Sequence, residues 1–315
     1  MRYMEAFRKG NSQGEFHQSF RSQSAMEYLV TYGWAILIIA VVLAALFELG
    51  VFNPMTFAPK ASPGSCQVVR PEGAGTTNFI SLEGECNGEL PQYVGRFNGA
   101  IGAGIVGYSL PAINVNAFTL TAWIDVSYYT NSGPSYNIFT IFKSGGGYVF
   151  LNKGACLGCS PALTAVSSTV SVVYGVGSSK PQPSTNTWYF VAATWNGTSN
   201  TIRIYQNNQL AGQGPENGSV LYPMSGAFSF GSAADGSQAF YGDLSNEQLY
   251  NVALSQPEIT ALYQEGIGGA PIDLQNLVGW WPLNGNANDY SGNGNNGVPN
   301  GVTYTSNWYS GYSAP

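Results

Sequence analysis

The stretch AFTLTAWIDV, residues 117–126, alternates between two kinds of side chain along its length. One set is apolar and the other is mostly polar: Phe118, Leu120, Ala122, Ile124 and Val126 against Thr119, Thr121, Trp123 and Asp125. Successive side chains of an extended chain point to opposite faces, so a period of two indicates a β-strand. The stretch therefore predicts a strand with one apolar face.

Further short strands are predicted around it. WYFVAATW at residues 188–195 is typical of another strand, and TIRIYQNNQLAGQ at residues 201–213 predicts a hairpin that turns at Asn207-Asn208. IFTIF, YVFL, TVSVVY and AFSFG add more strands, separated by Gly, Ser and Asn. Together these segments predict a mainly β fold, a two-sheet jelly-roll sandwich.

One helix is predicted after these strands. Ser255 and Glu258 have the spacing of a capping box, and Gly266 stands where the helix should end. The apolar face between them consists of Ile259, Leu262 and Tyr263.

Three blocks of this region stand in a recognisable order: AFTLTAWIDV, TWYFVAATWNGTSNTIRIYQNNQLAG and FYGDLSNEQLYNVALSQPEITALYQEG. Over residues 92–266 the chain resembles the laminin-G-like, concanavalin A-like lectin/glucanase jelly roll. The resemblance implies the fold alone, because lectins, adhesion modules and glycosidases share it.

Composition excludes several functions. The chain of 315 residues has a formal charge of -6, and its four N-terminal basic residues precede an apolar run. Without residues 1–22 the charge is -8, from 7 basic and 15 acidic residues, so nucleic-acid binding is not expected. The single histidine, His17, lies in the same leader, which removes Ser-His-Asp catalysis and His-ligated zinc from a mature chain.

Glycosidase chemistry depends on carboxylates that lie close together. A retaining glycosidase on this fold would need closely spaced acids on one strand, of the E-x-D-x-E type. No such cluster occurs, and Asp125, Asp235, Asp243 and Glu247 are scattered along the sequence. The sequence therefore favours a binding or structural role, with a glycosidase as the alternative.

An apolar helix is predicted over residues 23–52. No residue from Tyr28 to Phe47 is charged, and a helix of that length covers about 30 Å, the thickness of a bilayer core. No small-residue cleavage site follows the run, so we expect the helix to be retained at the membrane rather than removed as a secretory signal. A buried core helix is the alternative.

RSQSAMEYL at residues 21–29 resembles the class III signal peptide of archaeal type IV pilin-like proteins. The resemblance implies that a prepilin peptidase removes leader 1–22 by cutting between Ser22 and Gln23, and that pilin-like subunits are partners. Glu27 then becomes the fifth mature residue, the acidic assembly position of that family. The leader is long, and Ser22 stands where Gly is commoner.

Glu27 has a physical reason for such a role. A carboxylate at the start of an apolar helix is costly to desolvate unless it meets a cation, and a neighbouring subunit's α-amino group is one candidate. The position also favours negative charge because it lies near a helix N-terminus. The alternative is an interfacial Glu without a partner.

The four cysteines indicate an exported protein. Residues 53–91 are rich in Pro and Gly and predict a stalk, in which Cys66 and Cys86 are spaced as a disulfide-closed loop. Cys156 and Cys159 form a lone CxxC without a second pair, so we favour a short disulfide or two free thiols over a redox or zinc site.

Residues 277–297 resemble the opening block of the jelly-roll family but follow its closing block, and they begin a C-terminal stretch that runs to residue 315. LVGWWPLNG either pairs into the same sandwich as a permuted closure, with Trp280 or Trp281 in the core, or belongs to a truncated second repeat. The first is our prediction for a jelly roll of residues 92–315, because so short a stretch buries no core of its own.

Two weaker signals lie on predicted turns. Asp289, Ser291 and Asn293 form an oxygen-rich turn that either binds Ca²⁺ or is a metal-free Asn/Gly turn. Asn196 and Asn217 each begin an N-x-S/T glycosylation sequence.

From these features the sequence predicts a pilin-like adhesin or recognition protein of the cell surface, whose ligand is a carbohydrate or a surface glycoprotein. The alternative is a membrane-tethered protein that binds or processes glycans and never polymerises.

Overall fold

The computed structural model describes residues 17–49, 51, 57–113, 116–128, 136–142, 147–153, 161–167, 170–177, 184–215, 224–233 and 236–315. The chain divides into two compact units, Met1–Phe57 and Ala58–Pro315. We describe each unit by itself.

The first unit contains one long helix, α1 (His17–Glu48), of 32 residues. Its segment Met26–Glu48 has a mean hydropathy of 2.5 and is long enough to cross a membrane. The helix includes both residues of the Ser22–Gln23 bond and ends at Glu48, whereas the sequence analysis expected an apolar helix over residues 23–52.

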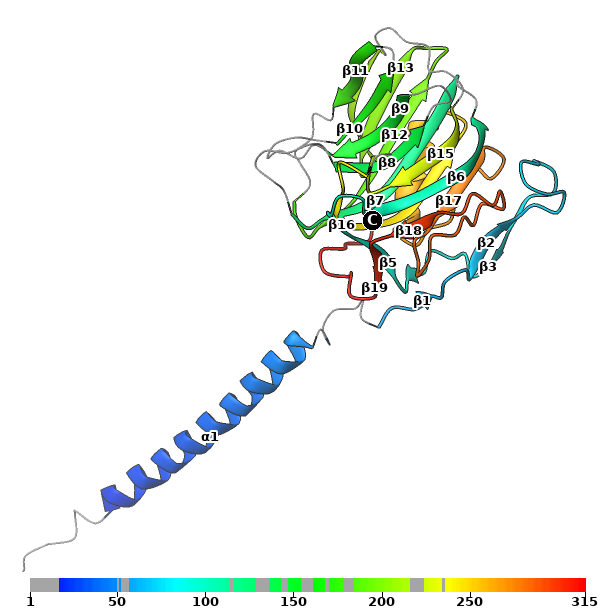
Figure 1. The fold of residues 1–315 in the computed structure, drawn as a ribbon. Helices are drawn as coiled ribbons and strands as arrows, with labels where there is room; N and C mark the ends of the chain where they lie inside the picture. The colour runs from blue at the N-terminus through cyan, green and yellow to red at the C-terminus, as the bar shows by residue number, and fades with distance from the viewer. Residues whose placement is uncertain are drawn as a thin grey trace, which may run out of the picture. The chain divides into compact units, whose positions relative to one another are not determined.

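The second unit is a β-sandwich of two antiparallel sheets, as predicted (Figure 1). The seven-stranded sheet has the order β11 (Val170–Gly177), β10 (Pro161–Ser167), β9 (Gly147–Lys153), β8 (Tyr136–Phe142), β15 (Met224–Phe230), β6 (Gly104–Ile113) and β18 (Val298–Asn300). The eight-stranded sheet has the order β14 (Gln209–Pro215), β13 (Thr201–Gln206), β12 (Trp188–Asn196), β7 (Ala117–Val126), β16 (Tyr241–Tyr250), β5 (Val94–Asn98) and β19 (Val302–Thr305), and β17 (Leu277–Trp281) pairs with the second half of β16.

The core between the sheets comes from the apolar set of β7. Phe118, Leu120 and Ile124 are fully buried there, together with Trp281 from β17. The other face of β7 is buried as well, because α2 (Gln256–Glu265) and the C-terminal segment cover it. Trp123 on that face stacks on Tyr263 of α2 with ring centroids 5.8 Å apart. The alternation therefore marks two buried layers rather than one apolar face.

The C-terminal block completes the sandwich, as the permuted closure requires. Trp281 packs between the sheets against Phe228 and Phe230, with centroids 4.7 and 4.9 Å away. After β17 the chain adds β18 to one sheet and β19 to the other, crossing between them at Gly301 (Figure 1). The positive φ of 64° at this crossing suits glycine. The block thus closes one side of the sandwich.

The predicted stalk at 53–91 was wrong from residue 58 onward. Two small sheets, β1 (Lys60–Ala61) with β4 (Leu90–Pro91) and β2 (Cys66–Val69) with β3 (Ser81–Gly84), fold onto the sandwich. Val68 is buried in the apolar layer that covers the outer face of the eight-stranded sheet. Arg70 is also buried, and it donates a hydrogen bond to the C-terminal block. Pro and Gly here serve tight turns rather than an extended linker.

Two local predictions are confirmed. The hairpin β13–β14 turns at Asn207-Asn208, with Asn207 at a φ of 54°. The N–H of Ser255 donates to Glu258 Oε2 at 2.7 Å, which caps α2.

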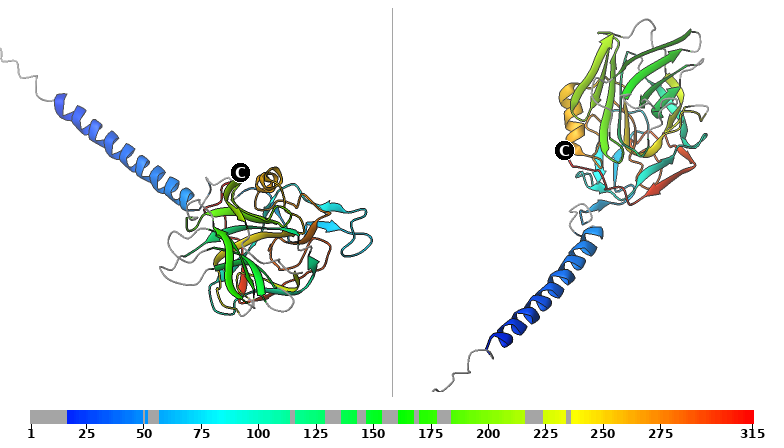
Figure 2. Two further views of the ribbon diagram at one scale, coloured as in Figure 1. Left: turned by 90° about the horizontal axis from the view of Figure 1, so that it is seen from above. Right: turned by 90° about the vertical axis from the view of Figure 1, so that its left-hand side faces the viewer.

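The views in Figure 2 show the C-terminus beside α2, where the Ile267 N–H donates to Tyr312 Oη at 3.2 Å.

Candidate binding site

A small cleft with a cavity volume of about 30 Å³ opens where five segments of the second unit converge. Its walls come from the segment Ala61–Cys66, the loop Glu85–Pro91 and the residues after α2, Ile267–Gly269. Asn246 and the segment Trp280–Asn284 complete the lining. A cavity of this size has room for about one water molecule and is much smaller than the usual small-ligand pocket.

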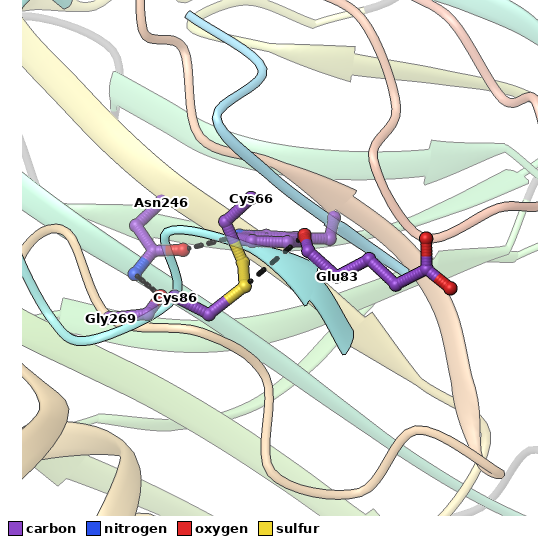
Figure 3. The surroundings of a disulfide bond; sticks show 6 residues. Cys66, Glu83, Cys86, Asn246 and Gly269 are labelled. Carbon is purple, nitrogen blue, oxygen red and sulfur yellow. Dashed lines mark hydrogen bonds between the residues drawn. A yellow bond between two sulfur atoms is a disulfide. The ribbon is translucent and has the colours of Figure 1, made fainter. Parts of the chain in front are cut away.

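Asn246 lies in this lining because β16 carries a bulge between Ser245 and Gln248. Its φ of 54° is unusual for a residue other than glycine. The amide is fully engaged: Nδ2 donates to the carbonyl of Gly269 at 2.9 Å, and Oδ1 accepts from Trp280 Nε1 at 2.8 Å (Figure 3). The bulge therefore ties three lining segments together.

The Cys66–Cys86 disulfide borders the same cleft (Figure 3). The pairing is the one expected from the sequence, and it joins β2 to the loop after β3 with Cα atoms 5.0 Å apart. It fixes the wall that carries Glu85 and Glu89.

Asp289, in the turn that was predicted to bind Ca²⁺, accepts hydrogen bonds from protein groups. Asp289 Oδ1 accepts from the N–H groups of Trp280 and Ser291 at 3.0 and 2.8 Å. Its Oδ2 accepts from Ser291 Oγ at 2.9 Å and from the Asn295 N–H at 2.8 Å. Burial raises the pKa of this carboxyl, and these hydrogen bonds oppose the rise.

The other two oxygen donors of that turn are engaged in the same way. Ser291 Oγ accepts from the Asn293 N–H at 3.3 Å, and Asn293 Oδ1 accepts from the Gly75 N–H at 2.9 Å. The oxygens that would face a cation face N–H and O–H donors instead, and the described residues include no cluster of three acidic, His or Cys ligands. The turn does not fit Ca²⁺ and instead holds β17 to the following loop.

Two acids that are scattered in the sequence meet in the structure. Asp125 of β7 pairs in register with Asp243 of β16, and Arg96 of β5 pairs with Asp243 on the other side. Arg96 donates from Nε and Nη2 to the two oxygens of Asp243, both at 2.8 Å. Burial, followed by the charge of Asp243, raises the pKa of Asp125 to about 6. The expectation of scattered acids was wrong for this pair, because cross-strand register is invisible without the topology.

This pair does not have the form of a glycosidase site. Both oxygens of Asp243 are held by Arg96, and Asp125 is 7% exposed with Oδ1 buried. Neither carboxyl is free to approach a sugar, as an acid and a nucleophile must. Glu247 lies on the bulge of β16 and is 0% exposed, in register with Trp281. Asp235 lies outside the described residues.

Other predicted site residues lie on described helices and strands. Glu27 is exposed on α1, and Ser22 and Gln23 belong to the same helix. Asn196 is half-buried at the end of β12, where its Oδ1 accepts from the Ser199 N–H at 3.1 Å. Cys156, Cys159 and Asn217 lie outside the described residues.

Comparison with known proteins supports the fold. Residues 104–260 match the family Laminin_G_3, described as the concanavalin A-like lectin/glucanases superfamily. This match covers 157 of the 315 residues, just under half of the chain, and lies within the jelly-roll sandwich of the second unit. No curated protein sequence matches the chain.

Several solved structures are similar to this chain at low sequence identity. A Bacteroides ovatus protein provisionally described as carbohydrate binding is 18% identical with a TM-score of 0.50, covering 72% of this chain and 63% of its own. A heptameric SAP-like pentraxin of Limulus polyphemus is 17% identical with a TM-score of 0.48, covering 67% and 94%. The CBM40 domain of the Ruminococcus gnavus IT-sialidase is 12% identical with a TM-score of 0.39, covering 51% and 96%. The chain thus spans less than two thirds of the first of these proteins.

Proposed function

We propose that this protein binds glycans outside the cell through its concanavalin A-like domain, while its apolar helix holds it at the surface. One observation carries the proposal: a lectin-type jelly roll stands in the same chain as an exposed 23-residue apolar segment. The disulfide fits an exported domain. The acid pair favours binding over hydrolysis, because Arg96 holds both oxygens of Asp243 and Asp125 is buried.

The form of display that we propose is pilin-like. The motif at residues 21–29 supports processing by a prepilin peptidase between Ser22 and Gln23, after which Glu27 would meet the α-amino group of a neighbouring pilin-like subunit. The apolar surface of α1 suits the interior of a helical bundle as well as lipid. The alternative is a tethered monomer that binds the same glycans.

Cells that produce the full chain test both parts. Adhesion to glycan-coated beads should exceed that of cells without the protein, and mass spectrometry of the mature N-terminus should find Gln23. Equal adhesion of both cell types would contradict the binding proposal. A mature chain that begins at Met1 or beyond Phe47 would contradict the processing proposal alone.

Glu27→Gln separates assembly from cutting. We expect normal processing and reduced incorporation into filaments, because the variant loses the charge that would pair with a neighbouring amine. Unchanged incorporation would remove Glu27 from the assembly hypothesis.

A further inference from the structure

We propose that a patch on the outer face of the eight-stranded sheet binds a neutral saccharide, an assignment that rests on the proposed glycan-binding function. The patch consists of Tyr128, Tyr241, Arg96 and Asn98. α2 and the C-terminal segment cover other parts of this outer face. The patch lies at the strand ends that these two segments leave exposed. We call it the tyrosine patch.

Two tyrosines form the apolar part of the patch. Tyr241 begins β16 and is 41% exposed, and Tyr128, two residues beyond β7, is 56% exposed. Their rings meet edge to face with centroids 6.4 Å apart. The backbone supports the pair, because the Ser127 N–H donates to the Tyr241 carbonyl at 3.1 Å. Exposed rings held in place give a sugar a flat apolar surface at small entropic cost.

Strand register places the polar part beside the rings. Asn98 of β5 pairs with Tyr241, and Arg96, two residues earlier on the same face, pairs with Asp243. Diagonal neighbours of this kind lie about 7–8 Å apart, within one sugar ring of each other. Asn98 Oδ1 accepts from the Ala100 N–H at 3.0 Å, which leaves its Nδ2 group to donate outward.

Arg96 presents a fixed donor edge. Its Nε and Nη2 atoms are held by Asp243, so the planar guanidinium cannot rotate, and its side chain is still 47% exposed. Nη1 has no acceptor among the described residues. Fixed Arg and Asn donors match the hydroxyl or N-acetyl oxygens of a saccharide.

Charge decides between neutral and anionic sugars. Arg96 lies against two carboxyl groups, Asp243 and the recessed Asp125, whose Oδ1 is buried without a partner. With both acids ionised the cluster carries a charge of -1, so it does not attract a sialic acid, uronic acid or sulfate. The patch therefore suits uncharged residues such as hexoses and N-acetylhexosamines.

Substitution of the tyrosines in the full chain in detergent tests the assignment. The probes are immobilised neutral glucans, mannans, galactans and N-acetylglucosamine oligomers beside sialylated and sulfated glycans, followed by titration of the tightest neutral binder. Tyr241→Ala and Tyr128→Ala should each weaken binding about tenfold, since each removes a stacking face. Tyr108→Ala is the matched control, because Tyr108 is 75% exposed on β6 of the other sheet.

The outcomes separate the two proposals. If the native chain binds neutral glycans and both tyrosine variants bind equally well, the patch is not the site. Preference for anionic glycans that grows below pH 6 would also overturn the neutral assignment. If no glycan binds the native chain, the proposed function fails and the patch assignment fails with it.

Discussion

Arg70 donates from Nε to the carbonyl oxygen of Ser291 at 2.9 Å, although the two residues are 221 positions apart. The same guanidinium donates from Nη2 to the carbonyls of Leu274 and Leu277, and from Nη1 to that of Thr76. One buried side chain thus joins the disulfide-closed N-terminal segment to the C-terminal block that closes the sandwich.

Arg70→Met should destabilise the domain markedly. The change leaves several buried carbonyl groups without donors, and we expect a loss of about 2–4 kcal/mol in the free energy of unfolding. Thermal unfolding of the full chain measures it. Arg203→Met, on the half-exposed strand β13, is the control and should change the stability little. Equal stability of the two variants would mean that Arg70 does not hold the segments together.

Removal of the disulfide by the double change Cys66→Ser and Cys86→Ser should lower stability by about 3 kcal/mol, because the closed loop limits the entropy of the unfolded chain. The wall of the cleft should also loosen, which hydrogen exchange at residues 81–91 would detect. Recovery of both cysteines as free thiols from non-reduced native protein would contradict the pairing.

Much of the fold could be predicted from local pattern. Strands, the β13–β14 hairpin and the cap of α2 depend on side chains that are close in sequence, and their physical signals are complete within a few residues. Trp123 shows the limit. Its place in the polar set of β7 gave no sign of a second buried layer, because the covering rings of Tyr263 and Tyr312 come from segments far along the chain.

The candidate sites were less predictable for the same reason. The cleft needs segments from both ends of the domain, and the pairing of Asp125 with Asp243 depends on the register of β7 against β16. The Asp289 turn was recognisable as oxygen-rich, but only the structure shows which donors occupy its carboxylate. A signal for Asn246 existed in the sequence DLSNEQL, where polar residues interrupt the apolar alternation of a strand.

Glu247 makes stability depend on pH. Its carboxyl is fully buried with neither oxygen bonded to a described residue, and burial raises its pKa well above 4.5. A raised pKa means that the folded state holds a proton that the unfolded state releases. This contribution to stability is complete below about pH 4.5 and falls as the pH rises toward the folded pKa.

Glu247→Gln should therefore reduce the loss of folding stability with rising pH. For one proton, the free energy of unfolding falls by at most about 1.4 kcal/mol per pH unit. Denaturant unfolding between pH 5 and pH 8 measures the slope. Glu265→Gln, at an exposed position on α2, is the control and should keep the native profile. If Glu247→Gln follows the native profile too, the carboxyl is not buried as described.

The Asp289 turn should be stable without metal. Addition of Ca²⁺ or of EDTA should shift the melting temperature by less than about 1 °C, since the carboxylate is already bonded to protein donors. Asp289→Ala should cost about 2–4 kcal/mol, because several buried donors lose their acceptor. A rise of several degrees with Ca²⁺, absent from the variant, would restore the metal hypothesis.

Glycan binding by the native full chain is the most direct test of the account. An array of defined neutral and anionic glycans, probed with detergent-solubilised protein, measures it without any variant. We predict saturable binding to a subset of neutral glycans, with dissociation constants in the range of about 1 μM to 1 mM that suits a small site. Failure to bind any glycan at 1 mM would contradict the central claim and leave the jelly roll as a structural module.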